Sequence, residues 1–216
     1  MARQADLDLI ADIHSRAFPQ SFLACLGMRA VKKYYGHFLN FQDRIVVVVE
    51  VQDQVIGFAV GWGRNISYMR DLTAALGKTL LLGLIRLVVL HPARVLQKIA
   101  QSTSLGQTVR LRLSRSVDAE IGNSADASYR LLVIAVRDGH HGRGASVHLL
   151  DAFTNQCRSF GISSVFLTVE ACNQRARRFY ERHGWKEAVE LEGRSVRYLL
   201  LLGDASPKVD GTLDCR

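Results

Sequence analysis

The stretch from residue 129 to residue 153 limits the possible folds more than any other part of the chain. An apolar run, Leu131 to Val136, is followed by a charged turn rich in glycine and then by apolar residues at helical spacing. The glycines are Gly139, Gly142 and Gly144, and the helical apolar positions are Val147, Leu149, Leu150 and Phe153. This order predicts a buried strand, a loop and a helix. Because loop amides and a helix N-terminus attract anions, and glycine has no Cβ to keep a phosphate away, the stretch indicates a phosphate site.

A second strand and a second helix are predicted directly downstream. Residues 165–169 form a β-rich run, and residues 173–183 have the pattern of a helix. We expect that helix to end at Gly184, because glycine commonly terminates helices. Two more strands are expected at residues 185–191 and 196–202.

The N-terminal part of the chain predicts two helices followed by a hairpin. Apolar residues recur at helical spacing over residues 6–17 and 28–39. Two runs rich in β-branched residues, 44–51 and 55–62, then flank the short polar segment 52–54. This arrangement predicts an antiparallel pair of strands joined by a tight turn.

Three segments, taken in this order, resemble the Gcn5-related N-acetyltransferase (GNAT) superfamily. The window from His141 to Ser146, His-Gly-Arg-Gly-Ala-Ser, is similar to the family's acetyl-CoA loop, Gln/Arg-x-x-Gly-x-Gly/Ala. His and Ser replace the family's residues at the first and last positions of that loop. The strand that contains Ile134 precedes the loop at the family's spacing. Asn173 and Tyr180 match the downstream block Asn-x-x-Ala-x-x-x-Tyr. The resemblance covers residues 129–202 well and residues 1–62 loosely.

The resemblance implies an α/β (α+β) fold with one GNAT-like domain over residues 1–202. The expected sheet is mixed and mostly antiparallel, with helices on both faces, and it splays open next to the strand 131–136. A helical insertion at residues 64–127 is expected between the third and fourth strands. The tail, residues 203–216, is expected to be disordered because it is short, polar and contains Pro207 and Gly211.

The resemblance also implies that the protein binds acetyl-CoA as a co-substrate. On this reading one strand holds the pantetheine arm and the glycine loop holds the diphosphate through backbone N–H groups. The residues expected to bind acetyl-CoA are Ile134, Ala135, Val136, His141, Gly142, Arg143, Gly144, Ala145, Ser146, Val147, Asn173 and Tyr180. Arg175, Arg177 and Arg178 are candidates for the 3′-phosphate, or they form a solvated helix face.

Two residues are expected to take part in catalysis. The resemblance assigns Tyr180 as the acid that protonates the departing thiolate, and a phenol suits this role because its O–H can point at sulfur. The alternative for Tyr180 is a buried core residue, and the alternative for Asn173 is a helix N-cap. Relatives that acetylate protein N-termini often carry Glu at the position of Thr168, which cannot act as a base. Glu170 lies on the same face of that strand and is the candidate base, through a water.

Two further sources of the base stay open at this point. Asp118 or Glu120 of the insertion is an alternative, as is a reaction with no side-chain base.

Net charge and cysteine content limit the classes of partner, compartment and metal site that we expect. The chain has a net charge of +8, and most of the excess positive charge lies between residues 67 and 116. The apolar run 79–90 within that segment is consistent with a lid over the acceptor site, a homodimer contact or contact with a membrane surface. No apolar run reaches the roughly 20 residues of a membrane span. Four scattered cysteines indicate reduced thiols in the cytoplasm and no metal site.

The expected activity is acetyl-CoA-dependent transfer of an acetyl group to a primary amine of a small molecule. The segment 18–27 with the pair Tyr34-Tyr35 is similar, more loosely, to acetyltransferases associated with bacterial surface-polysaccharide synthesis. That similarity favours an amino sugar on a nucleotide or lipid diphosphate. The alternatives are acetylation or longer-chain acylation of protein N-termini or amino acids, and a non-catalytic acyl-CoA-binding module. Nucleic acid is not expected as a partner, because no nucleic-acid-binding motif is present.

Overall fold

A computed structural model describes residues 1–63, 68–77, 128–191, 195–203 and 214–215. The chain divides into two compact units. We call one the sheet unit, which comprises Met1–Asp6, Phe38–Arg64 and Ala125–Arg216. The other is the helical unit, which comprises Leu7–His37 and Asn65–Ser124. The single domain expected over residues 1–202 stays a prediction.

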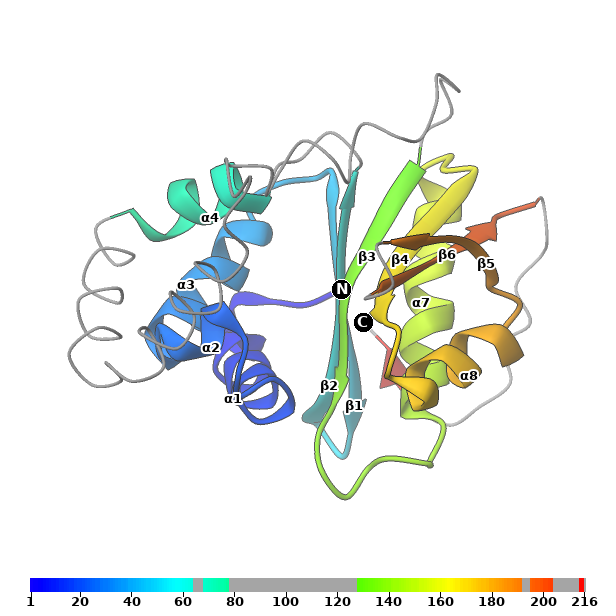
Figure 1. Cartoon of the computed structure of the whole chain (residues 1–216). Helices are drawn as coiled ribbons and strands as arrows, with labels where there is room; N and C mark the ends of the chain where they lie inside the picture. The colour runs from blue at the N-terminus through cyan, green and yellow to red at the C-terminus, as the bar shows by residue number, and fades with distance from the viewer. Residues whose placement is uncertain (64–67, 78–127, 192–194, 204–213, 216) are drawn as a thin grey trace. The chain divides into compact units, whose positions relative to one another are not determined.

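The sheet unit contains one mixed, mostly antiparallel sheet of seven strands (Figure 1). Their order across the sheet is β5-β6-β4-β3-β2-β1-β7. Among the described strands, the only parallel neighbours are β3 and β4. The bounds are β1 Arg44–Val51, β2 Gln54–Gly63, β3 Ser128–Val136, β4 Ser164–Glu170, β5 Lys186–Leu191, β6 Ser195–Leu201 and β7 Asp214–Cys215. The predicted fold class is therefore confirmed, and all six strands expected outside the insertion are present.

The hairpin of β1 and β2 forms where the sequence predicts it. Val51 pairs with Gln54, and the two residues between them, Gln52 and Asp53, both have positive φ. Two consecutive residues with positive φ are typical of a type I′ turn, whose twist suits a two-residue hairpin. The β-branched run of β1 is buried, and Ile45, Val47 and Val49 belong to the apolar cluster that also contains residues of α7.

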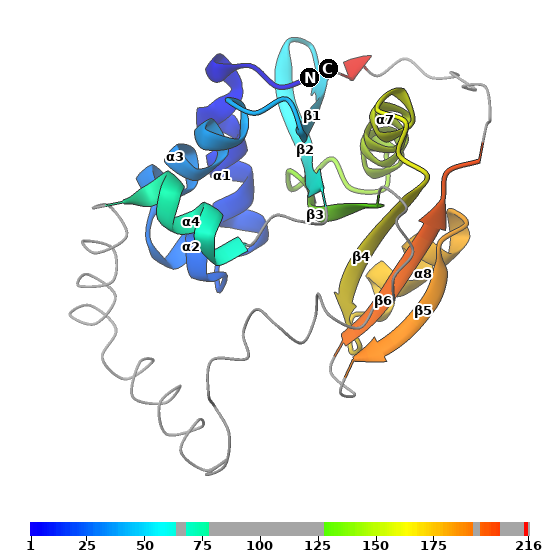
Figure 2. The same cartoon turned by 90° about the horizontal axis from the view of Figure 1, so that it is seen from above.

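The sheet splays between β3 and β4, as expected. The two strands pair only through their first three residues, from Ser128 opposite Ser164 to Arg130 opposite Phe166. The rest of β3 keeps its antiparallel pairing with β2 up to Val136. The rest of β4 pairs with β6. Within the described sheet, the carboxyl-terminal halves of β3 and β4 are therefore paired on one side only (Figure 2).

Helices α7, Ala145–Ser159, and α8, Gln174–Arg182, pack on one core. The helix α7 contacts β1, β2 and β3 and connects the parallel strands β3 and β4. Its residues Leu149 and Phe153 are buried in the same apolar cluster as Tyr180 of α8. The sequence places glycine on β2 where α7 packs closest, since a Cβ on Gly61 would lie 2.3 Å from Phe153 Cζ.

The helical unit contains α1 Leu7–Ala17, α2 Phe22–Cys25, most of α3 Met28–Phe38, and α4 Tyr68–Leu76. Its core includes a buried polar chain: His14 Nδ1 lies 2.8 Å from Tyr35 Oη, and His14 Nε2 lies 3.2 Å from Ser21 Oγ. Ser21 also caps α2 by accepting the Ala24 N–H at 3.1 Å. These contacts give the segment 18–27 a structural role in connecting α1, α2 and α3.

Two expectations about the remaining chain meet the structure only in part. The range 64–127 lies between β2 and β3, one strand earlier than the expected numbering, and α4 is its described helix. The apolar run 79–90, with its lid, dimer and membrane alternatives, lies outside the described residues.

The tail was expected to be disordered, but residues Asp214–Cys215 pair with β1 because its outer edge offers free backbone groups. No helix in the described part of the chain is long and apolar enough to cross a bilayer.

Candidate functional site

The splayed edge of β3 presents backbone groups that no neighbouring strand uses. Arg137 N–H donates to Ile56 O of the β2 side at 2.7 Å. Because amides alternate between the two edges of a strand, the N–H groups of Val136 and Ile134 point toward the opened side. Ala135 and Val136 are buried, and Ile134 packs against the apolar cluster. An extended ligand with amide groups could therefore pair with this edge as a further strand would.

The loop after β3 leads into an open helix N-terminus. Gly139, Gly142 and Gly144 all have positive φ, which only glycine adopts without strain. Gly144 is the N-cap of α7 and no side chain caps this helix. None of the described residues accepts a hydrogen bond from the N–H groups of Ala145 and Ser146. Val147 N–H, by contrast, donates to Gly144 O at 2.9 Å. Free amides at a helix N-terminus suit the binding of an anion, and the role of this loop in phosphate binding stays a prediction.

Two histidines border this loop. His141 Nε2 lies 3.5 Å from Asp138 Oδ1, and its side chain is exposed. His148, which the sequence reasoning did not single out, donates from Nδ1 to the Gly144 carbonyl at 3.0 Å and so fixes the loop on the helix. Its position four residues after Gly144 is the signal that could have found it, because such residues lie one helical turn apart. Arg143 is exposed at the same loop.

Tyr180 lies on α8 with its ring in the core. The side chain is 7% exposed and contacts Trp185 edge to face, with ring centroids 5.6 Å apart. Burial raises the pKa of the Tyr180 phenol above its ordinary value, so the group stays protonated. None of the described residues hydrogen-bonds its hydroxyl. The arrangement therefore offers one neutral O–H donor that the fold itself does not use.

Asn173 is the N-cap of α8. Its Oδ1 accepts the Ala176 N–H at 3.1 Å, which is the capping role that the sequence left as an alternative. Its side-chain NH₂ group has no acceptor among the described residues. The cap and a contact to a ligand are therefore compatible in this geometry.

The candidate base, Glu170, is exposed at the end of β4. Its Oε2 lies 3.8 Å from Cys172 Sγ, close enough for a weak S–H donor contact. Thr168, two residues before it, has a buried Oγ1 with no hydrogen-bond partner among the described residues. The base role of Glu170 stays a prediction, and Asp118 and Glu120 lie outside the described residues.

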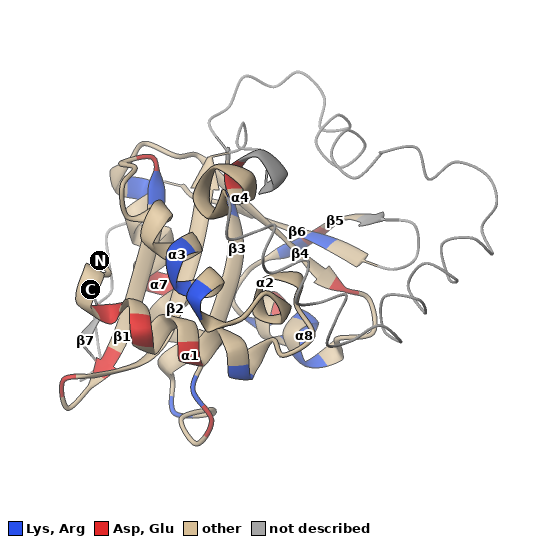
Figure 3. Ribbon diagram, turned by 90° about the vertical axis from the view of Figure 1, so that its left-hand side faces the viewer, with Lys and Arg blue, Asp and Glu red and all other residues tan. Residues whose placement is uncertain are grey.

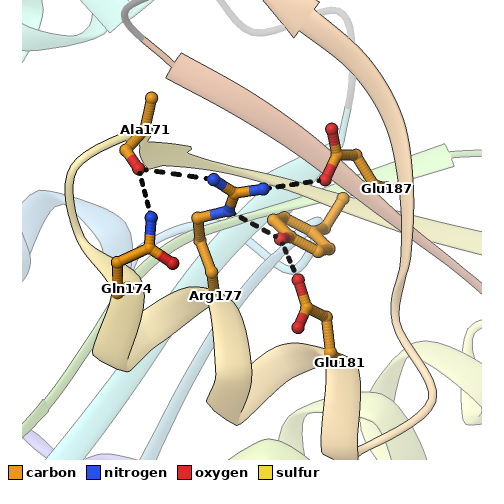
Figure 4. Close-up of polar contacts among 6 residues, drawn as sticks. Ala171, Gln174, Arg177, Glu181 and Glu187 are labelled. Atoms are coloured by element: carbon orange, nitrogen blue, oxygen red, sulfur yellow. Dashed lines mark hydrogen bonds and ion pairs between the residues drawn. The ribbon is translucent and has the colours of Figure 1, made fainter.

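The sequence reasoning missed a polar network around Arg177. This side chain was a candidate for phosphate binding or a solvated helix face. In the structure it instead donates to Tyr198, Glu187 and the Ala171 carbonyl (Figure 4). Arg175, Arg178 and Arg182 of α8 remain exposed. Figure 3 shows the basic residues of α8 in blue. Only the strand register could have revealed the network, because its members are up to 21 residues apart.

Comparisons with known proteins agree with this geometry. Residues 117–185 match the model of the Acetyltransferase (GNAT) family. No curated protein sequence matches the chain at a significant level. Among solved structures, 298 chains match its fold.

The three similar structures differ in source. A GNAT-family protein from Desulfovibrio desulfuricans has a TM-score of 0.56 at 15% identity, with 93% of this chain and 95% of that chain covered. The ribosomal-protein-S18-alanine N-acetyltransferase from Escherichia coli has a TM-score of 0.52 at 15% identity, with 97% and 96% covered. The protein yncA from Salmonella typhimurium, solved with its cofactor acetyl-CoA, has a TM-score of 0.54 at 14% identity, with 95% and 94% covered.

At these identities the similarity to solved structures establishes the fold, and the family match adds the class of domain. The matched range ends at Trp185 and includes the splayed edge of β3, the glycine loop and Tyr180. Residues 117–185 therefore match the acetyltransferase domain of the GNAT family, and the fold of the chain is similar to that of solved acetyltransferases.

Proposed function

We propose that this protein transfers the acetyl group of acetyl-CoA to a primary amine of a small anionic molecule. The acceptor that fits best is an amino sugar carried on a nucleotide or lipid diphosphate. In the described part of the chain, Cys25, Cys157 and Cys172 are free thiols, which suit the reducing cytoplasm where we expect the protein to act.

The observation that carries the proposal is the uncapped N-terminus of α7 at the end of a half-paired strand. The N–H groups of Ala145 and Ser146 would bind the diphosphate of CoA, because a helix N-terminus and a left-handed glycine cap leave them without acceptors. The opened edge of β3, from Ile134 to Val136, would hold the pantetheine arm by strand-like hydrogen bonds. The strand edge and the phosphate loop follow one another in the chain, so a single long ligand could contact both.

The chemistry supplied by acetyl-CoA is an activated acetyl group in a thioester. The amides of β3 would orient and polarise the thioester carbonyl. Tyr180 would donate its Oη proton to the departing thiolate, since its phenol is neutral and free of hydrogen bonds within the described structure. Glu170, through a water, is our candidate for accepting the proton of the amine.

Two arginines support the preference for an anionic acceptor. They lie on the face of the sheet opposite the core that contains residues of α7 and α8. Arg130 and Arg197 approach the Phe166 ring, with guanidinium carbons 6.0 Å and 5.5 Å from its centroid. These three residues come from adjacent strands, β3, β4 and β6, and each alternates with residues of the α7–α8 core. Positive charge next to a buried aromatic ring favours a phosphate or carboxylate, because the surroundings screen it less than water does.

A second candidate is a protein N-terminus. It is favoured by the shared fold with the Escherichia coli enzyme that acetylates the alanine of ribosomal protein S18. Thr168 counts against it, because a threonine cannot act as the base that such relatives often carry at this position.

The test is release of the CoA thiol from acetyl-CoA with a panel of amines. The panel contains amino-sugar nucleotides, amino acids, polyamines and short peptides with free N-termini. Release with amino-sugar nucleotides is the expected result. Release with peptides alone would select the second candidate, and release with polyamines alone would contradict an anionic acceptor. Binding of acetyl-CoA without release with any amine would indicate a non-catalytic module.

A further inference from the structure

A single guanidinium ties α8 to three other segments of the sheet unit (Figure 4). Arg177 Nη2 lies 3.1 Å from Glu187 Oε2 of β5, and Nε donates to Tyr198 Oη of β6 at 3.2 Å. Its Nη1 donates to the Ala171 carbonyl, in the turn between β4 and α8, at 3.4 Å. The planar fork of arginine suits this arrangement, because its donors point in fixed and different directions.

The hydroxyl of Tyr198 continues the network back to α8. It accepts from Arg177 and donates to Glu181 Oε1 at 2.7 Å, one helical turn further along. Burial, and then the Glu181 carboxylate, raise the pKa of the Tyr198 phenol, against the lowering effect of Arg177. The phenol therefore remains a neutral donor between the two side chains. Tyr198 is fully buried, so its ring has little freedom of its own.

The ring of Tyr198 also packs next to the ring of Tyr180. The two ring centroids lie 6.3 Å apart, and Trp185 closes another side of the Tyr180 ring. The network thus fixes Tyr198 at its hydroxyl end, and Tyr198 contacts Tyr180 through its ring.

We propose that Arg177 and Tyr198 are positioning residues, which set the orientation of Tyr180 for acyl transfer. This rests on the proposed function, in which Tyr180 supplies a proton to the leaving thiolate. A proton donor must approach the reacting atom within hydrogen-bond reach, and small misplacements cost much of its effect. Arg177 therefore acts through Tyr198 and does not bind the phosphates of CoA.

The kinetic test compares Arg177→Met and Tyr198→Phe with Arg182→Met. Arg182 is a matched control, because it is exposed on the same helix and, among the described residues, donates only to the Arg178 carbonyl of that helix. We expect kcat to fall about 10-fold in the first two variants, with little change in the KM for acetyl-CoA, because orientation and not binding is lost. Arg177→Lys should recover only part of kcat, since an ammonium cannot reach three acceptors in a fixed plane.

A double-mutant cycle separates positioning from general destabilisation. In the Tyr180→Phe background, Arg177→Met should lower kcat by less than about 2-fold, because the group that Arg177 orients is already absent. Equal effects of Arg177→Met in both backgrounds would overturn the proposal, as would an increase in the KM for acetyl-CoA with kcat unchanged.

A second readout does not depend on activity. With ¹³C-labelled tyrosine rings in the full-length protein, and the Tyr180 signal assigned by Tyr180→Phe, we expect this signal to shift or broaden in Arg177→Met and Tyr198→Phe. It should be unchanged in Arg182→Met. An unchanged Tyr180 signal in all three variants would contradict the proposal even if the wild-type enzyme is active. An inactive wild-type protein whose Tyr180 signal does respond would instead locate the failure in the proposed function.

Discussion

Tyr180 and Tyr198 lie with their ring centroids 6.3 Å apart, yet the two hydroxyls have opposite surroundings. Tyr198 Oη is bonded to Arg177 and Glu181, whereas none of the described residues hydrogen-bonds Tyr180 Oη. Tyr180 Oη is not among the fully buried polar atoms without a partner in the described structure, so solvent or a ligand can reach this hydroxyl. The hydroxyl of Tyr198 is therefore fixed by two hydrogen bonds, whereas the hydroxyl of Tyr180 is available to a ligand.

The contact between Gly61 and Phe153 should be sensitive to a single methyl group. A Cβ at position 61 would lie 2.3 Å from Phe153 Cζ and 2.5 Å from the Arg130 carbonyl, and the backbone atom cannot move aside. We expect Gly61→Ala to lower the free energy of unfolding by about 1–3 kcal/mol, through overpacking between β2 and α7. Urea unfolding measures this.

Gly63→Ala is the control for that experiment, because its Cβ would meet Tyr129 Cε2 at an ordinary 3.8 Å. Equal stability of Gly61→Ala and Gly63→Ala would show that α7 does not pack on β2 as closely as the structure has it.

Gly144 should matter for ligand binding beyond its effect on the backbone. Both Gly144 and Gly161 have positive φ, 84° and 69°, so replacement by alanine strains each backbone by about 1 kcal/mol. Only Gly144 caps the helix whose amides we assign to the diphosphate. We expect Gly144→Ala to weaken acetyl-CoA binding about 10-fold, measured by calorimetry, because the Cβ and the altered cap disturb these amides.

The Gly161→Ala variant should bind acetyl-CoA as the wild type does while losing similar stability. If both variants bind equally well, the anion site is not at the N-terminus of α7.

The role of Asn173 can be divided into cap and ligand contact. Asn173→Ala should lower stability by about 1 kcal/mol through loss of the bond to Ala176 N–H, whereas Asn173→Ser should keep the cap. Serine lacks the amide NH₂ group, so we expect kcat or the KM for acetyl-CoA to stay impaired in Asn173→Ser. Thermal unfolding and steady-state kinetics of both variants decide this. Full recovery of activity by serine would reduce Asn173 to a capping residue.

The strands and the site loop could be predicted from local patterns, because each depends on residues close in the chain. The β-branched run 44–51 and the polar pair Gln52 and Asp53 contain enough information for the hairpin. The glycines at 139, 142 and 144 likewise occupy positions with positive φ. Glycine marks such positions in a sequence because it adopts positive φ without strain.

The network of Arg177 could not be predicted, because it depends on tertiary register. Its partners on β5 and β6 meet it only once Glu187 and Tyr198 are paired across the two strands. The strand β7 was missed for a related reason, since two residues carry no periodicity and pair only because the edge of β1 is near. The helix α4 lies within the range where a helical insertion was expected, but its bounds were not predicted, although Leu72, Ala75 and Leu76 are buried at helical spacing.

Stability should fall in weak acid because of His14. Burial lowers the pKa of His14 from 6.5 to about 4. The unfolded chain therefore takes up a proton at a higher pH than the folded protein does. The contribution of His14 is complete above pH 6.5 and is lost as the pH falls toward 4, by about 3 kcal/mol in total.

Replacing His14 with glutamine removes this titration. Urea unfolding at pH 7 and pH 4.5 should show a smaller loss of stability on acidification in His14→Gln than in the wild type. The same loss in both proteins would mean that His14 is charged inside the folded helical unit.

The measurement that tests the central claim most directly is CoA thiol release by the wild-type protein and by Tyr180→Phe, with acetyl-CoA binding measured in parallel. Because burial raises the pKa of Tyr180 above about 10, the phenol should hold its proton over the whole assay range, so the two proteins should differ at every pH up to 9. We predict that the wild type releases thiol with an amino-sugar nucleotide, and that kcat in Tyr180→Phe is lower by about 100-fold with acetyl-CoA binding retained. Turnover within threefold of the wild type in Tyr180→Phe would contradict the assignment of the acid. Failure of the wild type to bind acetyl-CoA would contradict the account as a whole.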